Sequence, residues 1–276
     1  MIIDAHQHFW KIDRGDYHWM DDSVSAIRRD ILPVDLAPLA ASCGVDGTVL
    51  VQAAATTAET RFLLSLGQET PLIRGVVGWV DLEDPNVGST LANLSKDPLF
   101  KGVRPMLQDI EDTDWVLREN VVTGLRQVAL LGLSMDALVQ PRHLSALFEL
   151  SMKLPELDIV IDHCAKPKFT DDGDPGADWR EGVKLLAARP RVFCKLSGLA
   201  NEYGAGWGTD ALRPVFRHVL ECFGASRLMW GSDWPVLNLA GTYEDWHRCA
   251  RALTQELSET ERAAIFGGTA SRFYRL

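Results

Sequence analysis

The stretch Ile2-Ile3-Asp4-Ala5-His6 opens the chain with a short run of apolar, strand-forming residues. Seven further short runs, rich in apolar and β-branched residues, follow along the 276 residues. Because each run has the length and composition of a buried strand, we predict eight strands. They are residues 2–6, 48–52, 73–80, 102–106, 135–139, 158–162, 192–196 and 228–230.

Segments with helical periodicity separate these runs. The predicted helices are residues 35–43, 57–69, 85–94, 121–131, 144–153, 177–188, 209–223 and 243–256. Strict alternation of strand and helix implies a parallel sheet with helices outside it, and eight units imply closure. We therefore predict a single-domain (β/α)8 TIM barrel over residues 1–276. An open doubly wound sheet is the alternative, but no glycine-rich phosphate loop follows any predicted strand.

Composition and charge narrow the class of protein. Apolar residues make up 46% of the chain, enough for a large core, and the formal net charge is −10. Such an acidic chain disfavours nucleic acid and anionic membranes as partners. With no long apolar run, no signal-peptide pattern and five scattered cysteines, we expect a cytoplasmic enzyme with reduced thiols. No apolar stripe decides between a monomer and a homodimer.

Polar residues at the ends of predicted strands indicate a catalytic site. His6 and His8 belong to the first strand and its extension, His163 ends the sixth strand, and Asp233 follows the eighth. All four would lie at the carboxyl end of the barrel, where barrel enzymes carry out their chemistry. They could bind a divalent cation that activates water. Alternatively, Asp233 could act as a general base while the imidazoles polarise a carbonyl group. A lone strand-end histidine is usually structural, so the prediction depends on the set.

Further polar residues are expected inside the barrel. Arg104, on the lumen-facing side of the fourth strand, could stabilise an oxyanion or form a structural salt bridge. Lys195, in the middle of the seventh strand, should point into the lumen and pair with Asp136 or with Asp4, which alternation places on the same face as the histidines. Ser197, nearer the carboxyl end, could bind a substrate hydroxyl group.

Two connections, residues 9–32 and 165–178, are long for a compact domain and follow strand carboxyl ends. Loops of this length commonly serve as lids or binding loops. Trp19 in the first and Lys166 in the second are therefore candidates for substrate contact, and so is Trp230 in the eighth strand, since indoles stack on sugar rings. A packing role is the alternative for Trp230. The acidic run at residues 171–174 indicates a solvated turn, with calcium binding as the alternative.

Several motifs resemble the amidohydrolase superfamily, in particular its amidohydrolase-2 branch, which contains fuconolactonase-like and other sugar-lactone hydrolases. The H-Q-H-F-W and G-S-D-W-P-V segments carry most of the resemblance, which extends over essentially the whole chain. The matching segments are Asp4-Ala5-His6-Gln7-His8-Phe9-Trp10, Lys101-Gly102-Val103-Arg104, Ile161-Asp162-His163-Cys164-Ala165-Lys166-Pro167, Cys194-Lys195-Leu196-Ser197-Gly198-Leu199, Trp230-Gly231-Ser232-Asp233-Trp234-Pro235-Val236 and Gly267-Gly268-Thr269-Ala270.

The resemblance implies a barrel, a water nucleophile and small carbonyl substrates. Asp233 matches the family's residue that deprotonates water, and the three histidines match its metal-ligand or substrate-contact positions. The family's two-metal pattern needs a bridging Lys or Glu at the end of the fourth strand and a His at the end of the fifth. Here the fourth strand ends near Arg104-Pro105 and the fifth at Gln140-Pro141, so the pattern is broken. We therefore favour a site without metal. A single Zn²⁺ held by His6, His8, His163 and Asp233 is the alternative, since four ligands suffice for zinc.

The leading hypothesis is a hydrolase that opens a sugar lactone, such as L-fucono- or L-rhamnono-lactone, to the aldonic acid. A lactone suits a metal-free site because its ester carbonyl is more electrophilic than an amide. Asp233 could take a proton from water and return it to the leaving oxygen. A zinc-dependent hydrolase or decarboxylase of a small carboxylate is the second hypothesis. A sugar-acid binding protein without activity is the third, although binding alone needs no general base.

Overall fold

Eight parallel strands form one sheet in the order β1-β2-β3-β4-β5-β6-β7-β8 in the computed structural model, which describes residues 1–170 and 173–276. The strands are β1 (Ile3–Gln7), β2 (Gly47–Val51), β3 (Ile73–Gly78), β4 (Phe100–Val103), β5 (Ser134–Ala137), β6 (Asp158–Ile161), β7 (Val192–Leu196) and β8 (Leu228–Trp230). All eight predicted strands are present, with ends that move by at most three residues. The prediction of a parallel eight-stranded sheet is confirmed.

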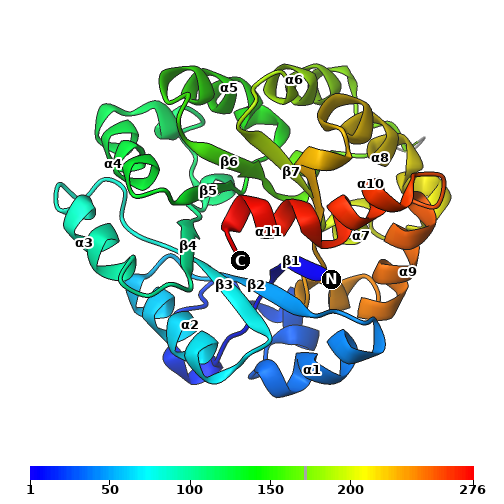
Figure 1. Cartoon of the computed structure of the whole chain (residues 1–276), viewed down its shortest axis with the longest axis horizontal. Helices are drawn as coiled ribbons and strands as arrows, with labels where there is room; N and C mark the ends of the chain where they lie inside the picture. Colours follow the sequence, from blue (N-terminus) through cyan, green and yellow to red (C-terminus); the bar gives the residue numbers. More distant parts are fainter. Residues whose placement is uncertain (171–172) are drawn as a thin grey trace.

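Helices surround the sheet, with one or more after each strand (Figure 1). They are α1 (Pro33–Ser42), α2 (Thr57–Glu69), α3 (Val87–Leu94), α4 (Glu119–Leu130), α5 (Leu144–Lys153), α6 (Ala177–Ala187), α7 (Leu199–Tyr203), α8 (Thr209–Phe223), α9 (Tyr243–Leu253), α10 (Glu259–Ala263) and α11 (Thr269–Tyr274). The short helices α7, α10 and α11 were not predicted. None of the described helices has both the length and the apolar content that crossing a bilayer requires.

The barrel closes between its last and first strands. The backbone N–H of Asp233 donates to the carbonyl oxygen of His6 at 2.8 Å, and that of His8 donates to the carbonyl oxygen of Trp234, also at 2.8 Å. Gln7 and Trp234 form a parallel bridge at the same place. The structure therefore confirms the predicted (β/α)8 barrel, and the closing bonds lie among the residues of the candidate site.

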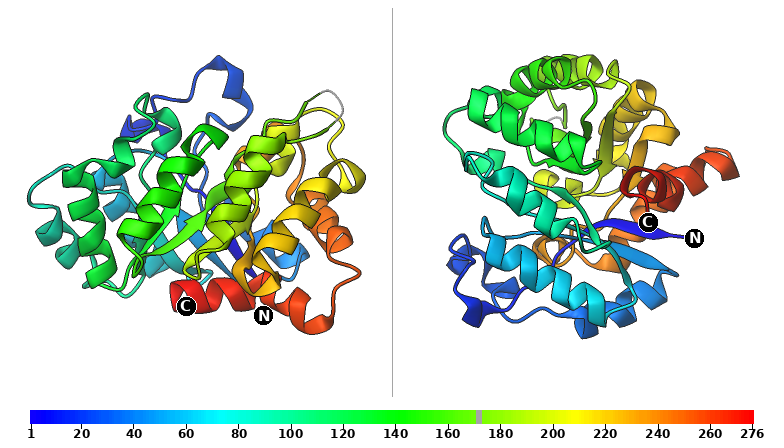
Figure 2. Two further views of the ribbon diagram at one scale, coloured as in Figure 1. Left: turned by 90° about the horizontal axis from the view of Figure 1, so that it is seen from above. Right: turned by 60° about the vertical axis from the view of Figure 1, so that its left-hand side comes forward.

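Helix α11 covers the amino-terminal end of the barrel, where both chain termini also lie (Figure 2). Ala270, Phe273 and Tyr274 of this helix pack against lumen-facing residues of the strands, including Ala5 and Met229. The segment of residues 9–32, dark blue in the left view of Figure 2, lies at the opposite end. The barrel is thus sealed at one end, and only the carboxyl end is open for chemistry.

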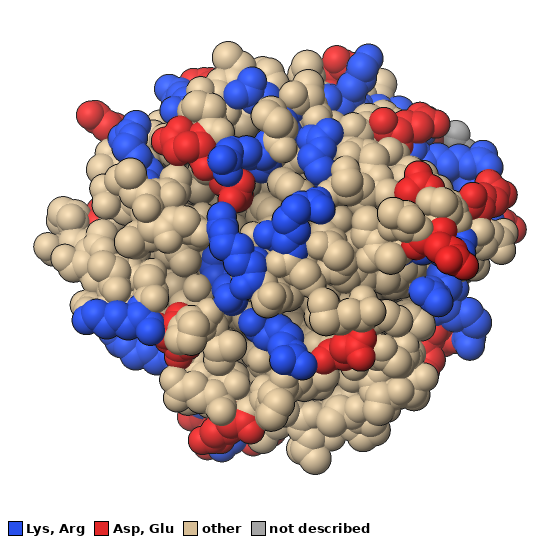
Figure 3. Space-filling view, in the orientation of Figure 1, with Lys and Arg blue, Asp and Glu red and all other residues tan. Residues whose placement is uncertain are grey.

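Lysine and arginine side chains gather near the middle of the sealed face (Figure 3). Here Lys101 donates to the carbonyl oxygen of Arg275 at 3.1 Å, and the Arg275 guanidinium pairs with Asp158 at 3.1 Å. The chain as a whole carries a net charge of −10, so its charges are unevenly distributed. The basic groups of this face lie at the end of the barrel away from the candidate site.

One prediction about the first strand is wrong. Alternation placed Asp4 on the same face as His6 and His8, but the pairing of β1 with β2 shifts register between Asp4 and Gln7. The Asp4 carboxylate instead accepts hydrogen bonds from the backbone N–H of Ser232 at 2.8 Å and from the Tyr243 hydroxyl on α9 at 3.0 Å. Asp4 therefore supports the closure of the barrel rather than pairing with Lys195.

The predicted acidic turn at residues 171–174 lies partly outside the described residues. Asp171 and Asp172 lie outside the described residues. Asp174 forms an ion pair with Arg180 at 3.0 Å at the start of α6. Calcium binding by this turn remains a prediction.

We predict that Phe273→Ala lowers the free energy of unfolding by about 3–5 kcal/mol, because it leaves a cavity under the barrel floor. Phe273 is 4% exposed, and its ring lies 4.8 Å from that of Phe193. Urea unfolding would measure the change. The control is Leu130→Ala on the outer helix α4, where the side chain is 71% exposed and we expect a change below about 0.5 kcal/mol. Equal losses in the two variants would show that α11 does not seal a packed core.

Candidate active site

Three imidazole rings and one carboxylate meet at the carboxyl end of the barrel. The Nε2 atoms of His8, His6 and His163 lie 3.3, 3.6 and 3.8 Å from Oδ1 of Asp233. The two imidazoles from the first strand also touch, with 3.2 Å between their Nε2 atoms. All four side chains are buried or nearly so. The structure thus brings together the four residues that the sequence predicted.

Strained backbone presents two of these side chains. His163 begins a run of four residues, ending at Lys166, whose φ angles lie between 48° and 61°, and Asp233 has a φ of 59°. Left-handed backbone costs roughly 1–2 kcal/mol at a residue with a side chain, and such strain is concentrated at functional sites. Gly198 leaves room for the His163 side chain, because a Cβ atom at residue 198 would lie 2.6 Å from Cγ of His163. The strain indicates that the position of His163 matters for function.

Hydrogen bonds determine which ring nitrogens carry protons. The carbonyl oxygen of Val51 lies 2.8 Å from Nδ1 of His8 and can only accept, so Nδ1 carries the proton. In a neutral His8 the Nε2 lone pair therefore faces the Asp233 carboxylate. Two lone pairs at 3.3 Å repel each other. This arrangement calls for a proton or a cation between them.

A buried charge cluster lies beneath His6. The Lys195 ammonium has three contacts: Oδ2 of Asp136 at 2.5 Å, Oδ1 of Asp162 at 3.1 Å and Nδ1 of His6 at 3.1 Å. All four side chains are fully buried. The predicted pair of Lys195 with Asp136 is confirmed, and the hydroxyl of Tyr274 on α11 donates to the same carboxylate oxygen at 2.8 Å. The cluster connects the floor of the barrel to the rim.

The surroundings set the protonation states of these groups. Burial alone would raise the pKa of Asp233, but the nearby His163 and a hydrogen bond formed when a proton lies between Asp233 and Nε2 of His8 hold it well below its usual range. Burial lowers the pKa of His163 to about 4, and burial with the Lys195 ammonium holds the pKa of His6 well below 6.5. At neutral pH, Asp233 is therefore a carboxylate beside two neutral imidazoles.

The two carboxylates around Lys195 have pKa values that are shifted in opposite directions. Burial raises the pKa of Asp136 to about 6, although Lys195 opposes this. Burial also acts on Asp162, but Lys195 and His6 outweigh it and hold the pKa of Asp162 well below its usual value. Of the two carboxylates, Asp162 is thus the one that stays ionised to lower pH, and it faces both His6 and Arg104.

Arg104 lies in the wall of the cavity above Asp233, consistent with the predicted lumen-facing position. Its Nε and Nη2 atoms donate to Oε1 of Gln52 at 3.1 and 2.9 Å, and Nη2 also donates to the Gln52 carbonyl oxygen. Only Nη1 is less engaged, with a single contact of 3.4 Å to Asp162. Gln52 therefore fixes the plane of the guanidinium, and Nη1 is the donor best able to reach a substrate oxygen.

A cavity of about 160 Å³ lies over these groups. Its lining includes Trp19 and Lys166, which were both predicted to contact substrate. The indole N–H of Trp19 donates to the carbonyl oxygen of Ala53 at 2.8 Å, and the Lys166 ammonium pairs with Glu202 at 3.1 Å. Both side chains reach the cavity from the two long connections.

Two predicted substrate contacts are corrected by the structure. Ser197 is fully buried and absent from the cavity lining, and its Oγ lies 2.9 Å from Nδ1 of His163. It therefore positions His163. Trp230 is also fully buried, with its ring against Tyr243 and Phe266 on the outer side of β8. Strand parity places the indole under the outer helices, so it takes the packing role.

Sequence reasoning missed Asp162 and Gln52 as parts of the site. Asp162 contacts His6, Lys195 and Arg104, and it ends the predicted strand of residues 158–162, which is otherwise largely apolar. That charged residue next to His163 was the available signal. Gln52 had no comparable signal, because an amide at the end of a strand is compatible with many surroundings. Its role depends on Arg104, which is 52 residues away in sequence.

Comparison with known proteins agrees with this geometry. Residues 3–276 match the family model described as "Amidohydrolase". The chain belongs to the amidohydrolase family. It is 44% identical to L-fucono-1,5-lactonase of Burkholderia ambifaria over 99% of this chain and 95% of that protein. It is 36% identical to L-fucono-1,5-lactonase of Burkholderia multivorans over 99% of this chain and 96% of that protein. The predicted family is confirmed.

A solved amidohydrolase structure from Burkholderia multivorans, with bound zinc, has a TM-score of 0.93 to this chain at 35% identity, covering 100% of this chain and 99% of that one. In the present chain, the possible ligand atoms of His6, His163 and Asp233 all lie within 4.8 Å of one another. Donors around a tetrahedral zinc with bonds of ~2.0–2.1 Å lie ~3.3–3.4 Å apart. The separations of 3.3–3.8 Å between the imidazole Nε2 atoms and Oδ1 of Asp233 are close to that value. The residues present fit a single divalent cation.

We predict that Lys195→Met lowers the free energy of unfolding by about 3–5 kcal/mol at neutral pH, because it leaves buried carboxylates without their counter-charge. Chemical unfolding would measure this loss. The control is Lys153→Met, which removes an exposed ion pair with Glu149 and should cost less than about 1 kcal/mol. Adding Asp136→Asn to Lys195→Met should restore part of the stability. Equal losses for the two lysines would contradict the structural role of the cluster.

Proposed function

We propose that this amidohydrolase opens a sugar lactone, such as L-fucono- or L-rhamnono-lactone, with water to give the free aldonic acid. The observation that carries the proposal is the ionised Asp233 carboxylate surrounded by three imidazoles at the base of a small cavity. The L-fucono-1,5-lactonases to which the chain is similar agree with the predicted reaction class, hydrolysis of a cyclic ester.

The chain supplies a base of the right kind for this reaction. Asp233 accepts a proton from water as the water oxygen attacks the ring carbonyl, which gives a tetrahedral oxyanion. When the carbon–oxygen ring bond breaks, Asp233 returns this proton to the leaving alkoxide oxygen. One water is consumed, one ester bond is opened, and the free acid ionises at neutral pH. The same carboxylate thus serves both proton transfers.

Two fixed donors can stabilise the oxyanion. Arg104 lines the cavity with a guanidinium that Gln52 holds in place, so this donor needs no reorganisation during the reaction. The Lys195 ammonium donates to Asp136, forms an ion pair with Asp162, and lies 3.1 Å from Nδ1 of His6, where it can donate a second hydrogen bond. When His6 accepts at Nδ1, its own proton lies on Nε2 and points toward the reacting atoms. Lys195 thus acts through His6 as a positioning residue.

His6, His163 and Asp233 would hold a cation at the same place. A bound zinc would lower the pKa of a water molecule and polarise the lactone carbonyl. For this, the His6 proton must move from Nε2 to Nδ1, where Asp162 accepts it across 3.3 Å. A carboxylate behind a ligating histidine is the usual support for a metal site. Asp162 would therefore support His6 as a metal ligand, whereas Lys195, which can only donate, supports the arrangement with the proton on Nε2.

We predict that Asp233→Asn lowers lactone turnover by at least ~10²–10⁴-fold, because the amide cannot take a proton from water. A pH indicator would follow acid release from L-fuconolactone. The control is Asp210→Asn on α8, whose carboxylate is fully exposed, and we expect unchanged turnover. Circular dichroism should show both variants folded. Retained turnover in Asp233→Asn would refute its role as the base.

We predict that this chain binds at most one divalent cation and that lactone turnover persists after chelation, since Asp233 remains to activate water. Elemental analysis and a turnover assay before and after dialysis against a chelator would check both points. His163→Ala should reduce the metal content. Loss of turnover on chelation with recovery on adding zinc would favour the zinc-dependent hydrolase instead. Two bound ions per chain would contradict the site described above.

A further inference from the structure

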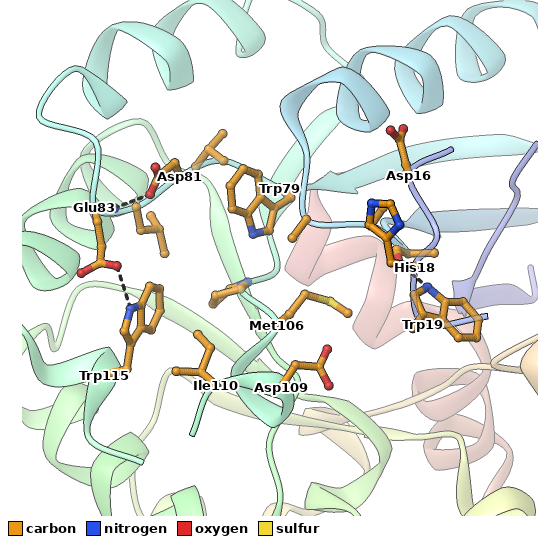
Figure 4. Close-up of a pocket in the computed structure, with 16 residues that line it drawn as sticks. Asp16, His18, Trp19, Trp79, Asp81, Glu83, Met106, Asp109, Ile110 and Trp115 are labelled. Carbon is orange, nitrogen blue, oxygen red and sulfur yellow. Dashed lines mark hydrogen bonds between the residues drawn. The ribbon is translucent and has the colours of Figure 1, made fainter. Parts of the chain in front are cut away.

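A second and larger cavity, of about 500 Å³, lies at the carboxyl end of the barrel over the segments that follow β1 to β4 (Figure 4). It adjoins the cavity above Asp233, because Trp19, Ala53, Met106 and Asp109 line both. The cavity above Asp233, at about 160 Å³, is smaller than the ~300–1,000 Å³ of common ligand sites, whereas the second falls within that range. The reaction described above makes no use of the second cavity.

Three indole rings surround this second cavity: Trp19, Trp79 and Trp115. Trp115 is held by a hydrogen bond from its Nε1 to the Glu83 carboxylate at 3.0 Å, drawn in Figure 4. Trp19 is held by its bond to the carbonyl oxygen of Ala53. The half-buried ring of Trp79 stands between them and points into the space (Figure 4). Rigid aromatic faces of this kind bind the apolar C–H faces of sugar rings.

The charges in the lining are all of one sign. Asp16, Asp81, Glu83 and Asp109 line the cavity, and among the described residues no lysine or arginine does. Carboxylates accept strong hydrogen bonds from hydroxyl groups, and they repel an anionic group. Two of them already have a counter-charge, since Asp16 pairs with Arg14 at 2.5 Å and Glu83 with Arg118 at 3.2 Å. The lining therefore suits a neutral group rich in hydroxyls better than an anion.

The wall between the two cavities is well fixed. The buried Glu59 carboxylate, on α2, accepts hydrogen bonds from the backbone N–H groups of Ala53 and Ala54 at 2.8–3.1 Å. The same backbone segment holds the indole of Trp19 through the Ala53 carbonyl oxygen. A ligand would thus meet preformed walls, which reduces the entropy lost on binding. Met106, with a flexible side chain, lies on the boundary of both cavities.

From these observations we propose that the cavity between Trp19, Trp79 and Trp115 is a subsite for a second, neutral sugar residue joined by a glycosidic bond to the lactone. This inference rests on the proposed lactone hydrolysis and extends it to glycosylated lactones. The chemical step is unchanged: water opens the ester, and the glycosidic bond stays intact. The second sugar would stack on Trp79 and donate its hydroxyl protons to Asp81 and Asp109.

The test compares L-fuconolactone with its mono-glucosylated derivatives, one for each free ring hydroxyl. We expect kcat/KM for at least one derivative to exceed that of the parent lactone about tenfold or more. Trp79→Ala should remove this advantage, with a much smaller effect on the parent. The control is Trp207→Ala, a half-buried indole that lines a different cavity, and it should leave the ratio of the two substrates unchanged. A derivative that never exceeds the parent overturns the proposal, and so does an equal loss on both substrates in Trp79→Ala.

A second comparison tests the charge argument with a variant on the surface of the cavity. A glucuronosyl derivative with the same linkage, which carries a carboxylate, should react at least about tenfold more slowly than the glucosyl derivative. The double variant Asp81→Asn/Asp109→Asn alters two exposed side chains and should narrow this gap. A gap that stays the same in the double variant would contradict the assignment of these carboxylates to the subsite.

Calorimetry separates failure of the subsite from failure of the proposed reaction. Lactams that replace the parent lactone and its glucosylated derivative cannot turn over under these conditions. The subsite predicts about tenfold tighter binding of the glucosylated lactam, lost in Trp79→Ala. If no lactone is hydrolysed but this difference in affinity is present, the reaction is wrong and the subsite is supported. Equal affinities of the two lactams overturn the subsite, whatever the turnover.

Discussion

The two backbone hydrogen bonds between the end of β8 and the end of β1 are the constraint on which the site depends. Asp233 donates to the carbonyl of His6, and His8 donates to the carbonyl of Trp234, both at 2.8 Å. These bonds close the barrel and bring residues about 225 positions apart in the chain into contact. The Asp233 carboxylate can lie against the imidazoles of His6 and His8 only when the last strand pairs with the first. The pairing that closes the barrel therefore also assembles the candidate active site.

Beneath these closing bonds, the buried charge cluster around Lys195 connects helix α11 at the floor of the barrel to His6 in the site. Tyr274 on the last helix bonds to Asp136, Asp136 to Lys195, and Lys195 to both Asp162 and His6. Buried ion pairs contribute little net stability because desolvation offsets their attraction. Their value here lies in orientation, since three fixed acceptors around one ammonium determine which His6 nitrogen faces the substrate. In a barrel core of apolar residues alone, nothing would determine which nitrogen of the His6 ring carries the proton.

Much of this arrangement was open to prediction from local sequence. Alternating apolar runs and helical periods predicted eight strands and helices such as α2 (Thr57–Glu69), because each element is encoded within its own residues. The position of a polar side chain relative to its strand end then placed His163 and Asp233 on one rim. Trp230 was a candidate for substrate contact with packing as the alternative, and the structure favours packing, which depends on the side of β8 that the indole occupies. Asp4 was misplaced because the register shift of β1 depends on its pairing with β2.

The sequence by itself thus determined the barrel, the family and the set of His6, His8, His163 and Asp233, since strand order and strand ends follow from local patterns. Only the tertiary structure decided what supports them: Asp162 under His6, Gln52 behind Arg104, and Tyr274 reaching up from the floor. Such contacts join residues tens to more than a hundred positions apart, and nothing in the local sequence records which distant partner a buried polar group will meet. The same holds for the aromatic cavity beside the site, whose walls come from the four connections that follow the neighbouring strands β1 to β4.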